Sequence, residues 1–562
     1  MARRTITWRA TVFHTGDDGE TVSGKTLRRT ARLAAVGLAG VLALAACASD
    51  GDGGGGERSS GSGAGGKDVT VGYLGDSDGG GDAVDGGTLV FGSYSFPTSL
   101  DPTKTQAAGS TGGTEMAAIY DTLVRSVPET GDFAPQLAEK LEHNDDYSEF
   151  TITLREGTTF SDGSVLDAEA VKWSIDRFVA AQADVAQAFD DIVDRIEVRD
   201  ERTVVFHLVD TWMDFPVLLS MGPGMIVAES SEAGPEFTPI GAGAFTLDTF
   251  KQNEEIKVVA NDDYWDGRPH LDAVTFVPTA GARGQLEALE SGQLNMAYIF
   301  RDEAVIGETI DAGYPGYLDI QGLGSLAPIN NAEGRPGADV RVRQAIAYAI
   351  DPAAVNERSQ DGLGIVSSEI LPESSLFYTG AEGIEYDPDK ARELLDEAKA
   401  DGYDGKIEYM TMNEPTAQAA ALVAEASLEA VGFDVEIDYV SSVTDLVRRQ
   451  YVEHDFDMTR GAFAFMDEAP YLRLYGPYGS DSRNNSTGYA DPETDEILLE
   501  LRSATSADEQ KDAIAKLQER VNETVPYVLW GPATVLTVWD TTVHDVVRSS
   551  DNIILLDKTW VD

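Results

Sequence analysis

The sequence has little of the chemistry that disulfide frameworks and metal sites require. Its 562 residues include one cysteine and six histidines. A single cysteine excludes an internal disulfide and every metal site built from several cysteines. The histidines are scattered along the chain, and no two have the spacing of a metal-binding helix. We therefore expect neither a cofactor nor a resident metal.

Basic residues are also scarce. The chain has 42 Lys and Arg against 97 Asp and Glu, which gives a formal net charge of −55. Affinity for nucleic acid comes largely from neutralising phosphates, so we expect no nucleic-acid partner. The charge says little about a bound solute, because salt screens distant surface charges over about 8–10 Å. It does indicate a strongly hydrated surface.

The apolar run near the N-terminus, residues 33–46, is too short for a transmembrane helix, which needs about 20 residues. Its fourteen residues follow a basic stretch and have the length of a signal-peptide core. Cys47, the only cysteine, comes directly after it. This arrangement resembles the bacterial lipobox, in which the cysteine is diacylated and becomes the mature N-terminus. The alternative is a chance cysteine at the end of an ordinary signal peptide.

The next segment is dominated by glycine. Sixteen of the forty residues from 48 to 87 are Gly, and Ser and Asp supply half of the others. Such a composition cannot bury a core and behaves as a flexible coil. Residues 1–46 are therefore expected to be a lipoprotein signal peptide, and residues 47–87 a lipidated Cys47 with a flexible tether. Stable anchoring by acyl chains would place the body on the extracytoplasmic face of the cell membrane.

The body begins at Thr88 and mixes strands with helices. Period-two alternation predicts strands over 88–92 and 150–154, and a hairpin over 196–208. Asp167 is a candidate N-cap for a helix over 168–178.

The second half has a different layout, with strands and helices in alternation. The expected elements are a helix over 388–400, a strand over 406–412, a helix over 417–431, a strand over 435–440, a helix over 443–452 and a strand over 456–458. A β-α-β-α-β order predicts a parallel, doubly wound sheet.

Six groups of short phrases, taken together, resemble one family: the extracytoplasmic solute-binding proteins, family 5, of peptide-type ABC importers. The phrases lie at 120–124, 128–131 and 135–139; at 154–157, 160–163 and 168–169; at 239–245; at 261–265 and 271–272; at 289–292; and at 340–351. Each phrase alone is weak evidence, whereas all of them in the family's order over residues 88–562 are specific.

This resemblance implies an α/β fold. The family fold is a two-lobed clamp of the type II periplasmic-binding-protein kind, with a discontinuous first lobe and an extra inserted subdomain. The expected segments are lobe I over 88–127, 236–318 and 523–562, the inserted subdomain II over 128–235, and an α/β lobe III over 319–522.

The implied function is solute capture and not catalysis. The chain would be the lipid-anchored, monomeric substrate-binding subunit of an ABC importer. It would close on an oligopeptide-like solute by a hinge motion and deliver it to the permease subunits.

In relatives the pocket residues come from a few segments, and these carry over to four places in this sequence. The candidate ligand-binding residues are Ser110, Thr111, Asn330, Asn331, Arg460, Phe463, Phe465, Asp467 and Trp530. The segment with Arg460 and Asp467 has independent support, because ligands of open parallel sheets bind beyond the carboxyl ends of the strands.

Each candidate role has a plain structural alternative. Peptide-binding relatives place an Asp in this segment to hold the ligand's α-amino group. Here the segment is one residue longer, Phe465 or Met466 falls near that place, and Asp467 lies beside it. Asp467 is the candidate for the amine contact, and the alternative is a solvated loop acid. Arg460 could hold a ligand carboxylate with two parallel hydrogen bonds, or could form an internal salt bridge. Phe463 and Phe465 could wall the ligand or pack in the core. Trp530 lies where the chain returns to the first lobe.

Other ligands and one other class of function stay open. An oligosaccharide could stack on Phe463, Phe465 and Trp530, and a metal chelate could be held through one histidine, of which His454 is nearest in sequence. A membrane-anchored hydrolase is the alternative from another class. It would need a nucleophile and a base, and the sequence has no Gly-x-Ser-x-Gly elbow.

Overall fold

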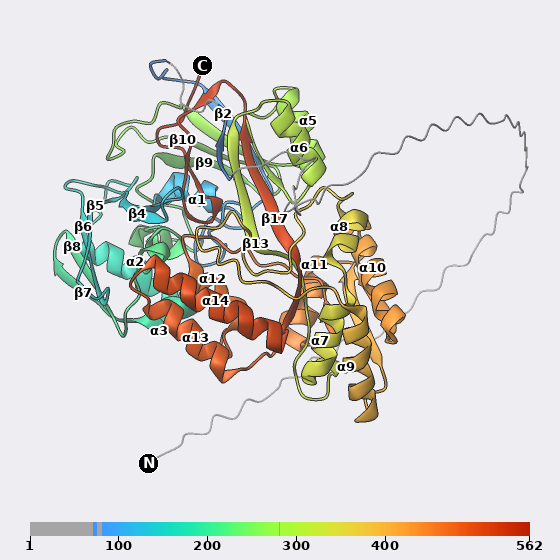
Figure 1. Ribbon diagram of the computed structural model, residues 1–562. Coiled ribbons are helices and arrows are strands. Elements are labelled where there is room, and N and C mark those ends of the chain that lie inside the picture. The colour runs from blue at the N-terminus through green and yellow to red at the C-terminus, as the bar shows by residue number, and fades with distance from the viewer. Residues whose placement is uncertain (1–70, 76–80, 280) are drawn as a thin grey trace, which may run out of the picture. The chain divides into compact units, whose positions relative to one another are not determined.

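The computed structural model describes residues 71–75, 81–279 and 281–562 (Figure 1). These residues belong to one compact unit that spans Ser60–Asp562. Cys47 and the predicted signal peptide lie outside the described residues. Three sheets of different construction organise the unit.

The large sheet has eight strands in the order β1-β13-β17-β12-β2-β11-β10-β9. Its strands are β1 (Gly72–Leu74), β2 (Thr88–Ser93), β9 (Phe245–Lys251), β10 (Glu255–Ala260), β11 (Ala273–Pro278), β12 (Met296–Phe300), β13 (Gly316–Pro328) and β17 (Tyr527–Trp539). Helices α1 (Gly113–Tyr120), α5 (Gly281–Glu290) and α6 (Glu303–Asp311) come from the same parts of the chain. Strands from both ends of the sequence belong to this one sheet, as a discontinuous first lobe requires.

Strand β1 corrects part of the tether prediction. Its three residues lie inside the predicted coil over 47–87, yet they pair antiparallel with β13. The Tyr73 ring packs edge-on against Tyr317, with centroids 5.0 Å apart, and its hydroxyl donates to the carbonyl of Val546 at 3.3 Å. A short Gly-Tyr-Leu stretch gives no sequence signal in glycine-rich surroundings, because its stability comes from distant partners.

The inserted sheet is antiparallel, with the order β5-β6-β8-β7. Its strands are β5 (Ala138–His143), β6 (Glu149–Leu154), β7 (Val193–Asp200) and β8 (Thr203–Leu208), and its helices are α2 (Ala168–Ala180), α3 (Ala186–Ile192) and the short α4 (Pro216–Leu219). The predicted hairpin and helix are confirmed. Asp167 caps α2, since its side chain accepts a hydrogen bond from the Ala170 amide at 2.9 Å.

The parallel sheet is confirmed as well, with β14 (Lys406–Met412) between β15 (Asp434–Val440) and β16 (Met458–Thr459). The third strand is shorter and later than the predicted 456–458. The predicted helix over 443–452 is a short α11 (Val443–Val447) that continues as a π-helical turn, Arg448–Glu453. The other helices of this half are α7 (Val340–Ala349), α8 (Pro352–Ser359), α9 (Pro388–Ala400), α10 (Pro415–Val431), α12 (Pro470–Tyr478), α13 (Pro492–Ser503) and α14 (Ala507–Thr524).

Three small antiparallel pairs complete the described strands. They are β3 (Val124–Val127) with β4 (Asp132–Pro135), β18 (Val543–His544) with β21 (Trp560–Val561), and β19 (Val547–Arg548) with β20 (Ile554–Leu555). The segment boundaries expected for the lobes stay a prediction.

Strands β13 and β17 run together from the large sheet toward the parallel sheet (Figure 1). Their register shifts between Gln321 and Ser325. Gly324 lies in that shift, where an added Cβ would stand 1.9 Å from the backbone nitrogen of Ala533, so only glycine allows this approach. Beyond it, isolated bridges join Leu326 to Gly461 and Ile329 to Met458. The two strands therefore connect the large sheet with the start of the segment after β16.

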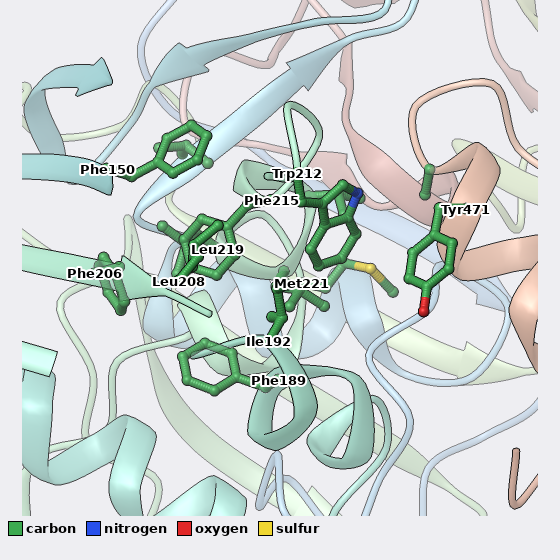
Figure 2. Packing of buried hydrophobic residues seen from close by; sticks show 14 of the residues in the cluster. Phe150, Phe189, Ile192, Phe206, Leu208, Trp212, Phe215, Leu219, Met221 and Tyr471 are labelled. Atoms are coloured by element: carbon green, nitrogen blue, oxygen red, sulfur yellow. The ribbon is translucent and has the colours of Figure 1, made fainter. Parts of the chain in front are cut away.

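The inserted sheet and helix α12 share one apolar core. Phe150, Phe206 and Phe215 pack together with ring centroids 5.2–5.4 Å apart. Trp212 lies beside them and meets Tyr471 of α12 edge-on at 5.6 Å (Figure 2). Aromatic contacts of this geometry add about 0.5–1.5 kcal/mol beyond burial of area.

A buried carboxyl lies at the same junction. The Asp214 side chain accepts a hydrogen bond from Gln510 Nε2 of α14 at 2.6 Å. Burial raises the pKa of Asp214 to about 7, against this hydrogen bond, which lowers it. The folded state therefore holds a proton on Asp214 at pH values where the unfolded chain has released it.

This pKa shift predicts a pH dependence of stability. Between the ordinary pKa near 3.8 and about 7, each unit of rising pH should remove about 1.4 kcal/mol of unfolding free energy through Asp214. Above pH 7 the loss of unfolding free energy through Asp214 is complete, and below pH 3.8 there is none. Asp214→Asn keeps the acceptor for Gln510 but cannot titrate. Urea unfolding at pH 5 and pH 7 should show a smaller loss of stability in the variant, and equal losses would contradict the assignment.

Candidate functional site

The segment after β16 is held in place by β13. The amide of Phe463 donates to the carbonyl of Leu323 at 2.8 Å, and the amide of Phe465 donates to that of Gly322 at 3.0 Å. An added Cβ on Gly322 would meet the carbonyl oxygen of Ile370 at 2.6 Å, so glycine permits this close packing. The predicted segment thus crosses from the carboxyl end of the parallel sheet onto the strand that leads into the large sheet.

Asp467 lies on this segment and faces a loop of the same half of the chain. Its two carboxylate oxygens accept hydrogen bonds from Ser375 Oγ at 2.5 Å and from the Leu376 amide at 2.8 Å. Burial raises the pKa of Asp467 to about 6, and these two hydrogen bonds lower it. At neutral pH the side chain is thus a positioned, half-buried carboxylate with acceptor capacity left for a cation.

Arg460 is at the start of the segment, where β16 ends. Its Nη1 lies 2.6 Å from Glu414 Oε1, and its side chain is 34% exposed. Glu414 directly precedes α10, beyond the carboxyl end of β14. The internal salt bridge is therefore present, and the remaining donors of the guanidinium are available to another partner.

The aromatic candidates differ in their surroundings. Phe463 is half-buried and packs edge-on against Tyr527, with centroids 5.4 Å apart, whereas Phe465 is 3% exposed and belongs to the core around the inserted sheet. Trp530 of β17 is 4% exposed and lies in the core around α7 and α10. Its indole Nε1 has no hydrogen-bond partner among the described residues.

The other four candidates form hydrogen bonds with backbone groups. The Asn330 amide nitrogen donates to the carbonyls of His454 and Phe456, both at 3.0 Å, and its oxygen accepts from the Ala332 amide. Asn331 donates to the carbonyl of Ile329 at 2.7 Å. Thr111 donates to the carbonyl of Gln106 at 2.9 Å, and the carbonyl of Ser110 accepts from Ser95. These contacts shape the loops around the segment.

Sequence reasoning missed a buried ion cluster that joins this segment to the C-terminal part of the chain. Arg548, 3% exposed, has Nη2 3.6 Å from Glu468 Oε1 and 3.5 Å from Asp319 Oδ2. Burial lowers the pKa of Arg548, but the carboxylates of Glu468 and Asp319 outweigh it, so the net shift is upward. Glu468 also accepts from the Asp551 amide at 3.2 Å.

A second ion pair reinforces the same connection. Arg473 of α12 has Nη2 2.7 Å from Asp551 Oδ2. The only sequence signal for these contacts was the acidic pair of Asp467 and Glu468. Arg548 and Asp551 stand in a stretch with no motif, and their partners are about 80 residues away or more. No group of three or more His, Cys, Asp or Glu side chains in the described part of the chain is placed to hold a metal ion.

Comparison with known families gives a decisive match. The family model described as bacterial extracellular solute-binding proteins, family 5 Middle, matches residues 132–485. The chain belongs to the family 5 extracellular solute-binding proteins. Membership confirms the sequence-based predictions of a solute-binding protein rather than an enzyme, and of the family itself.

Relatives of known function and structure agree with the family. The chain is 26% identical over 388 residues to the dipeptide-binding protein of Escherichia coli K12, covering 63% of this chain and 72% of that protein. It is 28% identical over 316 residues to a glutathione-binding protein of the same strain, covering 54% of this chain and 60% of the relative. Alignment with the second thus spans less than two thirds of its length.

The fold class is confirmed by solved structures. The oligopeptide-binding protein of Bacillus subtilis in complex with a nonapeptide superposes with a TM-score of 0.71 at 20% identity, over 86% of this chain and all of that chain. Within the described residues, no helix combines the length and the apolar character needed to cross a membrane.

The buried ion cluster leads to a stability prediction. Arg548→Met leaves the buried carboxylate of Glu468 and the partly buried one of Asp319 without their cation, and should cost about 3–5 kcal/mol of unfolding free energy. Glu468→Gln in the same chain removes one of these charges and should restore a large part of the loss. Urea unfolding of the two single variants and the double variant measures this coupling. Additive effects in the double variant would contradict the contact.

Proposed function

We propose that the chain is the lipid-anchored binding subunit of an ABC importer and that it captures an oligopeptide-like solute beside the segment 459–471. The account follows the sequence-based hypothesis. The protein would act as a monomer, hold its solute between the two lobes by hinge closure and pass it to permease subunits. The lipid on Cys47 would keep it at the extracytoplasmic face of the membrane.

The observation that carries the peptide part is the position of Asp467. A half-buried carboxylate, fixed by Ser375 and Leu376, stands on the segment that follows the last strand of the parallel sheet. A ligand ammonium group could form a charge-assisted hydrogen bond with it there. Arg460, seven positions earlier, adds a guanidinium for an acidic group of the same solute. Opposite charges on one segment suit a zwitterion better than a neutral sugar.

The Asp467 proposal predicts a selective loss of affinity. Asp467→Asn should weaken binding of a peptide with a free amino terminus by about 1.5–3 kcal/mol, because a hydrogen bond to a charged group is lost. Binding of the N-acetylated peptide or of a neutral oligosaccharide should change little. Isothermal titration with trialanine, N-acetyl-trialanine and maltotriose measures the three affinities.

The matched control is Glu373→Gln, which removes an exposed carboxylate close in sequence to Ser375. It should leave all three affinities as in the parent protein. Equal weakening of trialanine and maltotriose by Asp467→Asn would contradict the peptide proposal. Tight binding of maltotriose alone would favour the oligosaccharide alternative.

The anchor is tested separately in cells. Cys47→Ser removes the only thiol of the chain and with it the acyl acceptor, so the protein should move from the membrane fraction to the soluble fraction. Metabolic labelling with a tagged palmitate should mark the parent protein and leave the variant unlabelled. A labelled variant, or an unlabelled parent protein that still sediments with membranes, would contradict the lipid assignment.

A further inference from the structure

Side chains of the large sheet gather beyond the ends of two parallel strands. β2 and β12 pair in parallel, with Phe91 opposite Met296, so their carboxyl ends lie at the same edge. Tyr94 follows β2, and Arg301 follows β12. The Tyr94 ring packs against Phe300 with centroids 5.0 Å apart and is 44% exposed. The exposed ring of Tyr94 therefore lies at this edge of the sheet.

Arg301 is a partly buried cation whose side chain has no polar partner among the described residues. Its guanidinium carbon stands 4.4 Å from the centre of the Phe300 ring. Its Nε is inaccessible and unpaired, and no side-chain hydrogen bond or ion pair joins it to the residues described. Arg343, by contrast, is buried and has polar partners. Its guanidinium donates hydrogen bonds to the carbonyls of Thr524 and Gly337, both at 2.7 Å.

Two costs coincide at Arg301. A buried polar group without a partner loses its hydration and gains nothing in return. The backbone adds strain, because Arg301 has φ 54°, in the left-handed region that non-glycine residues rarely adopt. Its amide is fixed in that conformation by a hydrogen bond to the Thr534 carbonyl at 3.0 Å. The contact with the Phe300 ring offsets part of the first cost. No carboxylate among the described residues pairs with Arg301, although acids outnumber bases by 97 to 42 in the chain.

The charged side chain with the largest effect on Arg301 is another cation, Arg460. Burial, and after it the like charge of Arg460, lowers the pKa of Arg301 to about 10, so both arginines remain charged at neutral pH. The other groups that act on Arg301 are the phenols of Tyr94 and Tyr298, and none of them is a carboxylate. Arg460 comes from the end of β16, so cations from the large sheet and the parallel sheet act on the same region. An anion there would relieve their repulsion.

We propose that Arg301, beside Tyr94, is an anion-binding subsite that takes a carboxylate of the captured solute. A planar guanidinium can bind a carboxylate through two parallel hydrogen bonds. The inference rests on the proposed function and deepens it, because it gives the acidic group of the solute a second cation, Arg301. It places this contact on the large-sheet side, whereas Asp467 and Arg460 lie on the segment after β16.

The test compares acidic and neutralised peptides. The full chain is incubated with a desalted tryptic digest of casein, or with the same digest after methyl esterification, and retained peptides are quantified by mass spectrometry. The parent protein should retain the free acids at least about tenfold better than the esters, as expected for a charge-assisted contact. Arg301→Met should remove most of this preference and leave only the part that Arg460 supplies, and Arg301→Lys should restore part of the loss.

Arg358→Met, which removes an exposed arginine of α8, is the matched control and should behave as the parent protein. A parent protein that retains esters and acids equally, or an Arg301→Met variant that keeps the full preference, would overturn the proposal.

The unfolding midpoint without ligand separates this inference from the proposed function. Arg301→Met removes an unpaired, partly buried cation, so the variant should melt at a higher temperature than the parent protein. A lower midpoint would mean that Arg301 serves the fold, which would overturn the subsite. If the parent protein retains neither digest, the oligopeptide proposal fails, and the midpoint alone then decides whether Arg301 is an uncompensated cation.

Discussion

The pairing of β13 with β17 is the constraint on which the other parts of the structure depend. Both strands are thirteen residues long, and together they carry the backbone from the large sheet toward the parallel sheet. The two strands pair on both sides of the register shift, and Gly324 allows their close approach within it. Because β13 also binds the segment after β16, the position of Asp467 and Arg460 follows from this one pair of strands. A hinge in the family sense would have to act through the same connection.

Buried ion pairs reinforce the connection between distant parts of the chain. The chain is strongly acidic, yet its buried cations are concentrated where segments distant in sequence meet. Arg548 joins Glu468 and Asp319, and Arg473 joins Asp551. Breaking a buried pair of this kind is costly, because the remaining charge loses its compensation. Arg301 differs from both, since it is partly buried at the edge of the same region and has no carboxylate among the described residues to neutralise it.

Local patterns predicted the parts of the fold that local contacts stabilise. The hairpin of β7 and β8, the Asp167 cap and the β14–β15 pair follow from alternation, capping chemistry and strand–helix order. The ends of elements were less predictable where partners lie far away. β1 exists because β13 offers an edge, and β16 is short because the chain soon turns onto β13. Neither fact is visible in the residues themselves.

In the candidate site, too, local patterns predicted some features, and contacts with distant residues determined the others. The segment with Arg460 and Asp467 was predictable, because ligands of parallel sheets bind beyond the strand ends. The partners of those residues, Glu414 and Ser375, were not, since loop contacts leave no periodic signal. Arg301 did carry a signal, namely a single arginine directly after the apolar strand Met296–Phe300. It was overlooked because the family phrases do not include it.

Native mass spectrometry of the full chain, purified without denaturation, tests the central claim most directly. The account predicts that the protein carries a population of short peptides, visible as several bound masses that fragment into amino-acid ladders. A single bound mass that fragments as a neutral oligosaccharide would contradict the account. The family and the fold would still stand after that result, but the roles proposed for Asp467 and Arg301 would not.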